Sequence, residues 1–161
     1  MSFLDMDERL LDLAGKMDLV FSPVMDVKEF PLDVDVTLVE GAVANEDHLH
    51  HARLIRERTR FLVSFGDCAV NGNVTAIRNH LKGAWPVLER VYKEGVDLKP
   101  LVPSAPGIVP ALLDRVLSLH EVVPVDLFLP GCPPAAELIH FVLLELVEGR
   151  KPDLTRKLKY G

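Results

Sequence analysis

The stretch RFLVSFGDC, residues 60–68, is the segment that decides the predicted fold. Its first six residues form a mostly apolar run that stops at Gly66. A short continuous apolar run of this kind is typical of a strand in a parallel sheet that is covered on both faces. Asp67 and Cys68 follow directly, at the carboxyl end of the predicted strand.

Further strands and helices alternate on either side of this stretch. Strands are also predicted at 18–22, at 34–39 (VDVTLV) and at 125–129; helices are predicted at 2–17, 45–57, 74–81, 85–93, 110–119 and 135–148. The first helix is expected to begin in a capping box of Ser2 with Asp5, and the second at the N-cap Asn45. Residues 99–110 are rich in proline and predict a loop. This alternation predicts a doubly wound α/β sandwich with a parallel sheet, in a single domain over residues 1–161.

The composition narrows the class of protein. With 161 residues, 48% of them hydrophobic, the chain is long and apolar enough for one folded core. A net charge of −6 argues against a nucleic-acid partner, and no apolar run reaches the length of a membrane-spanning helix. No signal peptide is recognisable, and two cysteines do not make a disulfide framework, so the expected compartment is the cytoplasm.

Three loops at one edge of the sheet carry the residues of chemical interest. They are Glu40-Gly41-Ala42, Gly66-Asp67-Cys68 and Gly131-Cys132-Pro133-Pro134, each directly after a predicted strand. In open α/β sheets, functional groups collect beyond the carboxyl ends of the strands, so Cys68 and Cys132 are expected to face one site although they lie 64 positions apart. From residue type and spacing alone, the two thiols fit an iron–sulfur cluster, a zinc site completed by histidine, or a pair of buried free thiols.

The front of the chain lacks an expected element. Folds of this type begin with a strand that lies in the middle of the sheet, whereas this chain begins with a predicted helix. A sheet without its central strand leaves unpaired backbone, so we expect the chain to be an N-terminal truncation of a longer protein.

Several motifs carry a family resemblance that runs in order from residue 2 to about 150. They are SFLDMDERLLDL, VFSPVMDVKEFP, DVTLVEGAVANEDH, SFGDCAVNGNV, PGIVPALLDRV and VDLFLPGCPP. Together they resemble the small subunit of the bidirectional NAD-reducing [NiFe] hydrogenase, in its cyanobacterial-type branch. The 20-kDa-type subunit of respiratory complex I shares the GCPP turn, but not SFLDMDE or VEGAVANEDH.

The resemblance implies a flavodoxin-like fold and one 4Fe–4S cluster held by four cysteines. Cys68 matches the third ligand and Cys132 the fourth, and the first two form a C-x-G-C pair that the family carries just before the stretch matching Met1. Nickel–iron would lie in a large subunit and NAD in diaphorase subunits. The resemblance places Glu40 at the contact with the large subunit, where interface or proton chemistry and a structural hydrogen bond are both possible roles.

The remaining polar residues are expected to be structural. Asp67 is predicted to be a turn residue. The histidines at 48, 50 and 51 are predicted to form a solvated helix face. His120 is expected to be structural, with a cluster ligand or proton relay as the alternative, and His140 is expected to be a core or interface residue. The implied function is electron transfer between hydrogenase and diaphorase. The alternatives are a cluster-free docking module and a complex I-type electron-transfer subunit. No residue is assigned a catalytic role, because the resemblance places catalysis in the large subunit.

Overall fold

Three parallel strands form the centre of the protein in the computed structural model, which describes residues 3–94, 99–155 and 157–158. They are β1 (Val34–Glu40), β3 (Thr59–Phe65) and β5 (Leu127–Leu129), and they lie in the order β1-β3-β5. Val63 pairs with Leu38 on one side and Leu127 on the other, so β3 is the middle strand. Three of the four predicted strands, at 34–39, 60–65 and 125–129, are therefore confirmed.

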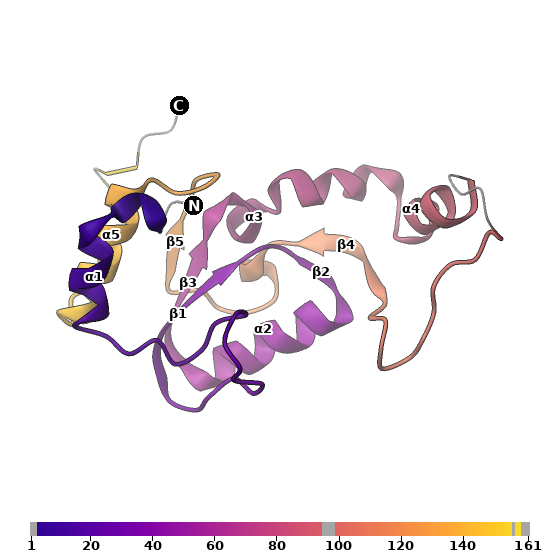
Figure 1. Cartoon of the computed structure of the whole chain (residues 1–161). Coiled ribbons are helices and arrows are strands. Elements are labelled where there is room, and N and C mark those ends of the chain that lie inside the picture. The colour runs from indigo at the N-terminus through magenta and orange to yellow at the C-terminus, as the bar shows by residue number, and fades with distance from the viewer. Residues whose placement is uncertain (1–2, 95–98, 156, 159–161) are drawn as a thin grey trace.

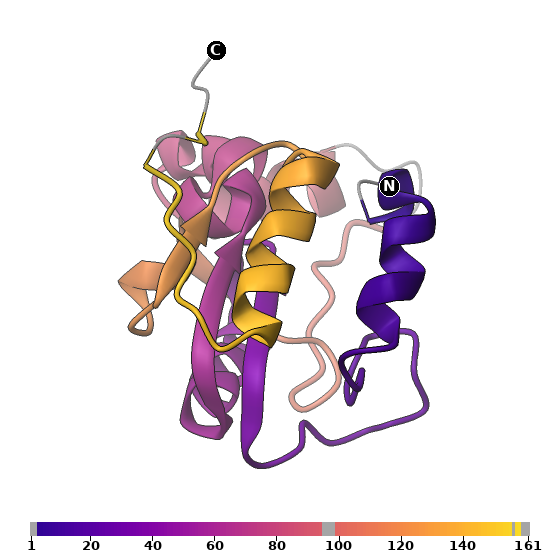
Figure 2. The ribbon, with the colours of Figure 1, turned by 90° about the vertical axis from the view of Figure 1, so that its left-hand side faces the viewer.

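Helices cover both faces of this sheet (Figures 1 and 2). One face packs against α1 (Glu8–Ala14) and α5 (Ala136–Val147), and the other against α2 (Glu46–Arg58) and α3 (Gly66–Asn71). Neighbouring residues of β3 point to opposite faces: Val63 belongs to the first core, with Ile139, and Leu62 to the second, with Ala52. Burial on both faces explains why β3 reads as a continuous apolar run, and it confirms the predicted α/β sandwich.

A second, two-stranded sheet extends the fold beside the first. It pairs β2 (Val43–Asn45) with β4 (Leu112–Leu117) in antiparallel fashion. The prediction of a helix over 110–119 is therefore wrong. Its apolar residues fall at helical spacing, but the ladder to β2 satisfies their backbone and a nonlocal partner overrides the local pattern.

The first predicted helix, over 2–17, is shorter and broken. A 3₁₀ turn, η1 (Leu4–Met6), precedes α1, and between them Asp7 has a φ of 51°, which interrupts the helix. The expected capping box includes Ser2, which lies outside the described residues. Residues 18–22 form no strand, because no described strand lies beside them to complete a ladder.

The remaining helices differ from prediction mainly in their type. Asn45 caps α2 as predicted, its side chain accepting a hydrogen bond from the His48 N–H. The predicted helix at 74–81 is a 3₁₀ helix, and the one at 85–93 begins as an α-helix and ends in a π-turn. The elements are η2 (Asn73–Leu81), α4 (Trp85–Glu89), η3 (Arg90–Glu94) and the short η4 (Leu119–Glu121). None of the helices in the described part of the chain has the length and hydropathy needed to cross a membrane.

Candidate functional site

A cavity of about 250 Å³ lies at the carboxyl ends of the three parallel strands. Its lining contains both cysteines of the chain and Glu40, so the structure brings together every site residue predicted from the sequence. The full lining is Glu40, Phe65, Gly66, Asp67, Cys68, Gly131, Cys132, Pro133 and Pro134. Apart from the carboxylates and thiols, these are glycines, prolines and one aromatic ring, so the walls are largely apolar.

Cys68 is positioned by the turn that joins β3 to α3. Gly66 has a φ of 78°, a conformation that glycine adopts without steric cost, and it turns the chain from strand into helix. Cys68 then lies in the first turn of α3 and is half-buried. The strand thereby fixes where the thiol sits, while the side chain still reaches the cavity.

Cys132 is positioned by a stiffer turn after β5. Gly131 has a φ of 136°, and the peptide bond between Cys132 and Pro133 is cis. Pro134, which follows, is fully buried and anchors the turn against the core. The Cys132 side chain is exposed, so the turn presents a thiol to the surface from a rigid backbone.

The two cysteine-bearing turns are joined by Asp67. Its backbone N–H donates to the Gly131 carbonyl oxygen at 2.9 Å, and its Oδ1 accepts from the Gly131 N–H at 2.7 Å. Asp67 lies at the strand-to-helix turn, as predicted, but its hydrogen bonds reach across to another loop. Sequence reasoning missed this role, and the only signal for it was the position of the aspartate directly before a cysteine.

Glu40 closes the third side of the cavity as the last residue of β1. Its side chain is exposed, and Gly41 follows with a φ of 90°. An exposed carboxylate at the rim of an apolar cavity can contact a second protein or carry a proton. Either role for Glu40 remains a prediction.

The donor set of this cavity is half of what a cubane cluster takes. Iron–sulfur clusters of the 4Fe–4S type are held by four cysteine thiolates, and the 161 residues contain two cysteines. Among residues 3–94, 99–155 and 157–158, no group of three or more Cys, His, Asp or Glu side chains is arranged to hold a metal ion. The cavity therefore fits two corners of such a cluster, and the other ligands would have to come from residues beyond these 161.

The clustered histidines lie away from this cavity. His48 Nδ1 accepts a long hydrogen bond from the Ala44 N–H at 3.4 Å, and His51 Nδ1 lies 2.9 Å from the Asp47 carbonyl oxygen, so both serve the start of α2. His120 is exposed, and its ring packs edge-on against Phe128 with centroids 5.5 Å apart. His140 lies half-buried on α5.

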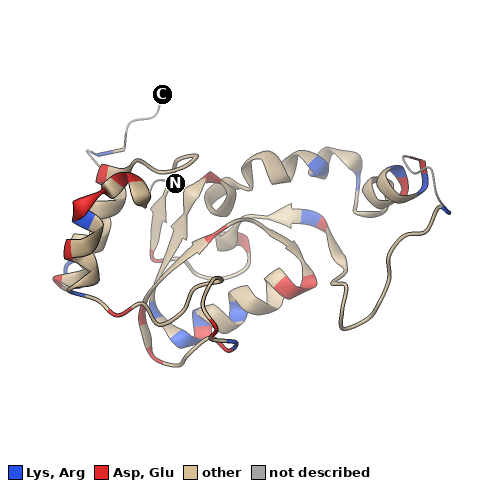
Figure 3. Ribbon diagram, viewed as in Figure 1, with Lys and Arg blue, Asp and Glu red and all other residues tan. Residues whose placement is uncertain are grey.

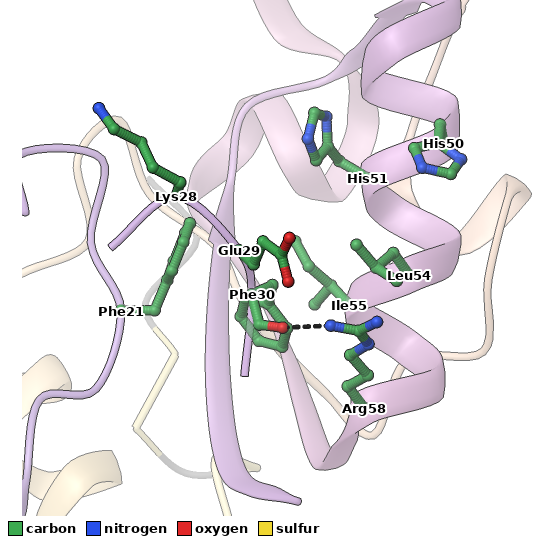
Figure 4. A pocket seen from close by; sticks show the side chains of 9 residues that line it. All are labelled: Phe21, Lys28, Glu29, Phe30, His50, His51, Leu54, Ile55 and Arg58. Atoms are coloured by element: carbon green, nitrogen blue, oxygen red, sulfur yellow. Dashed lines mark hydrogen bonds between the residues drawn. The ribbon is translucent and has the colours of Figure 1, made fainter. Parts of the chain in front are cut away.

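A second cavity, of about 330 Å³, separates α2 from the segment 21–30 (Figure 4). Its lining mixes acidic, basic and apolar side chains: Phe21, Lys28, Glu29, Phe30, His50, His51, Leu54, Ile55 and Arg58. The Arg58 guanidinium is committed to the Phe30 carbonyl oxygen, which it holds as a structural hydrogen bond. Because this guanidinium, the only one in the lining, is occupied by a structural contact, we describe the cavity as the space between the 21–30 segment and α2.

The fold and the first cavity define an α/β protein with paired thiols at the carboxyl edge of its parallel sheet. The chain belongs to the family of the NADH ubiquinone oxidoreductase 20 Kd subunit, whose model matches residues 1–146. Several of its relatives are hydrogenase subunits, in keeping with the resemblance found in the motifs.

Two relatives and one solved structure illustrate the similarity. The chain is 39% identical to the delta subunit of the NAD-reducing hydrogenase HoxS of Cupriavidus necator, over 96% of this chain and 75% of that protein. It is 36% identical to a subunit of the F420-non-reducing hydrogenase vhu of Methanococcus voltae, over 98% of this chain and 54% of that protein, so it spans about half of that relative. A structure of NAD⁺-reducing [NiFe]-hydrogenase in the H₂-reduced state matches with a TM-score of 0.91 and 40% identity, covering 100% of this chain and 90% of that one.

Proposed function

We propose that this chain is the electron-transfer small subunit of a cytoplasmic, NAD-reducing [NiFe] hydrogenase. The observation that carries the proposal is that the only two cysteines of the chain, 64 positions apart, line one cavity together with Glu40. The similarity to hydrogenase subunits supports the same reading. The chain is then part of an oxidoreductase, but it is not the part that activates hydrogen.

In this proposal, Cys68 and Cys132 each supply one thiolate to a 4Fe–4S cluster. When bound, such a cluster supplies one-electron transfer, at a potential set by burial and nearby hydrogen-bond donors. The residues of this chain present the two thiols: Gly66 and Gly131 let the backbone approach closely, and the buried Pro134 keeps the second turn rigid. The remaining two ligands are expected in a C-x-G-C pair, which the 161 residues do not contain.

The partners follow from the same proposal. Hydrogen is activated at nickel–iron in a large subunit, and electrons pass from there through this chain toward diaphorase subunits that reduce NAD. The exposed Glu40 at the rim of the cavity contacts the large subunit or carries a proton between the two chains.

The test uses the protein as it occurs naturally, purified anaerobically with the hydrogenase large subunit. We expect the wild type to contain about four irons and four sulfides in this chain, with visible absorbance of a 4Fe–4S cluster. Cys68→Ser and Cys132→Ser should each lower the iron and sulfide content and change the spectrum. His120→Ala, which alters a side chain away from the cavity, is the control. Unchanged iron in both serine variants would refute the proposal.

A cluster-free docking module is the second candidate, favoured by the presence of only two thiols in the 161 residues. Anaerobic reconstitution of the 161-residue chain and of a version extended by a strand and C-x-G-C separates the two candidates. We expect the short chain to take up no stable cluster and the extended chain to take up about four irons, because two thiolates do not satisfy a cubane. Failure of the extended chain to bind iron would favour the docking module.

A further inference from the structure

Asp67 joins the two cysteine-bearing turns through hydrogen bonds to both backbone polar groups of Gly131. Its N–H donates to the Gly131 carbonyl oxygen at 2.9 Å, and its carboxylate Oδ1 accepts from the Gly131 N–H at 2.7 Å. Each partner directly precedes a cysteine, since Cys68 follows Asp67 and Cys132 follows Gly131. The pair therefore connects the two thiol-bearing residues through a path of two short hydrogen bonds.

This pair continues the sheet beyond the point where the strands end. The ladder between β3 and β5 has its last pair at Phe65 and Leu129. It cannot continue regularly, because Pro130 has no N–H to donate and α3 begins at Gly66. Asp67 and Gly131 are the next residues in the same register, two positions further on. The carboxylate supplies the acceptor that a regular strand would have supplied.

A turn residue of the ordinary kind would behave differently. An aspartate that only shapes its own turn accepts a hydrogen bond from a backbone N–H about two residues further on. The carboxylate of Asp67 is instead committed to a residue 64 positions away. Without it, the N–H of Gly131 would lose its acceptor, and the glycine would be free to sample the wide range of conformations that its missing side chain allows.

We propose that Asp67 is a positioning residue that sets the separation of the Cys68 and Cys132 thiols. The proposal rests on the proposed function, in which these thiols hold one cluster, and it names the residue that preorganises them. Asp67 acts through the geometry of its Oδ1 acceptor rather than through its charge. An asparagine, which keeps that oxygen in place, should therefore substitute well, whereas a glutamate, which displaces it by one methylene, should not.

The first measurement does not depend on a cluster. In the complex of the full-length chain with the large subunit, after iron is removed by chelation, dibromobimane bridges thiols that lie close together, and peptide mapping identifies the Cys68–Cys132 product. We expect the rate of this cross-link to fall about ten-fold in Asp67→Ala, to fall clearly in Asp67→Glu, and to stay within about three-fold of the wild type in Asp67→Asn. If Asp67→Ala fails to fold, the cross-linking rates of Asp67→Glu and Asp67→Asn still test the proposal, which requires the faster rate in Asp67→Asn.

Asp126 offers a matched control at the other end of β5. Its N–H donates to the Leu62 carbonyl oxygen at 2.9 Å, and its Oδ2 accepts from the Leu62 N–H at 2.8 Å, which is the same reciprocal pattern away from the cavity. Asp126→Ala should lower stability but leave the cross-linking rate unchanged. If Asp126→Ala lowers the cross-linking rate as much as Asp67→Ala does, the effect comes from a general loss of stability and the proposal is overturned. The proposal is also overturned if Asp67→Glu cross-links faster than Asp67→Asn.

The second measurement follows the loaded complex. Iron release to a chelator should be about ten-fold faster in Asp67→Ala than in the wild type and nearly normal in Asp67→Asn. If Cys68→Ser and Cys132→Ser keep their iron, the proposed function fails. The positioning role of Asp67 is then tested by the cross-linking rates alone. If the serine variants lose iron while Asp67→Ala matches the wild type in both measurements, the positioning role is wrong and the proposed function stands.

Discussion

At the scale of single residues, Gly131 shows how tightly the cavity is built. Its φ is 136°, and a Cβ added there would lie 2.5 Å from the Pro134 Cα and 2.8 Å from the Pro134 nitrogen. Both contacts are to backbone atoms, which cannot move aside as a flexible side chain can. The turn that presents Cys132 therefore requires glycine for two reasons, its conformation and the space beside it.

Gly131→Ala should lower the free energy of unfolding by more than about 2 kcal/mol, because it adds a steric clash to the cost of a positive φ. Gly149→Ala is the control, since Gly149 has a φ of 73° with nothing within 4 Å of the added Cβ, and it should cost only about 1 kcal/mol. Urea unfolding in dilute solution, followed by the fluorescence of the single tryptophan, measures both. Equal costs for the two variants would contradict the steric argument.

The carboxyl group of Asp126 should make the stability of the folded protein depend on pH in acid. Burial raises the pKa of its carboxyl, but the Leu62 N–H and Arg56 lower it, and the net result is a pKa below the ordinary value. A carboxyl with a lowered pKa in the folded state stabilises that state above its ordinary pKa, and this contribution is lost as the pH falls through the folded value.

Asp126→Asn should therefore be less stable than the wild type at pH 7, by about 1 kcal/mol, because it loses the ion pair with Arg56 and weakens the bond to Leu62. The difference should persist down to about pH 4 and then narrow, as the wild-type carboxylate becomes protonated. Urea unfolding of both proteins across this pH range is the measurement. A difference that stays constant in acid would count against the predicted role of the carboxylate.

At the scale of elements, β4 shows how a nonlocal environment makes a strand. One edge of β4 pairs with β2, at Val43 with Leu117 and Asn45 with Leu112. From the other side, the Asn79 side chain in η2 donates to the Val116 carbonyl oxygen at 2.9 Å and accepts from the Val116 N–H at 2.7 Å. The amide of Asn79 thereby occupies the place of a further strand and protects that backbone from water.

Asn79→Ala should cost about 1–2 kcal/mol of stability and speed the hydrogen exchange of the Val116 amide, because two hydrogen bonds are lost. Asn79→Asp keeps the acceptor for that amide but loses the donor, and should have an intermediate effect. Asn71→Ala is a control, since the Asn71 side chain accepts only a local bond, from the Asn73 N–H. An unchanged exchange rate at Val116 in Asn79→Ala would disprove the bridging role.

At the scale of the whole molecule, η2 and α4 extend away from the three-stranded sheet (Figure 1), and both elements carry exposed apolar side chains. They are spaced three and four positions apart: Val74, Ile77, Leu81 and Trp85, exposed by 66%, 63%, 48% and 54%. Arg78 is the only Lys, Arg, Asp or Glu residue of η2. Figure 3 accordingly shows little blue or red between α3 and α4. An apolar row of this kind favours association with another protein surface.

The isolated chain should therefore self-associate as its concentration rises, and co-expression with a hydrogenase large subunit should reduce this. Ile77→Lys should shift the sedimentation profile of the isolated chain toward monomer, because a charge interrupts the apolar row. Val24→Lys is the matched control, since Val24 is 93% exposed and lies outside that row. A wild-type chain that stays monodisperse as a monomer at high concentration would contradict this prediction.

The sequence by itself determined the central sheet and the place of the candidate site. The runs at 34–39, 60–65 and 125–129 are apolar because their strands are buried on both faces, and that requirement can be read locally. Parallel strands place their carboxyl ends at one edge, so the order of elements was enough to bring Cys68, Cys132 and Glu40 to one cavity. The motifs also carried the hydrogenase resemblance, which the comparisons confirmed.

Some features depend on contacts between residues far apart in the chain, and only the tertiary structure decided these. Residues 112–117 have the apolar spacing of a helix but form a strand because β2 and Asn79 satisfy their backbone, and residues 18–22 resemble a strand but have no described neighbour to pair with. The link from Asp67 to Gly131 was likewise invisible, since it joins two loops 64 positions apart. A backbone hydrogen bond has two ends, and a local stretch of sequence specifies only one of them.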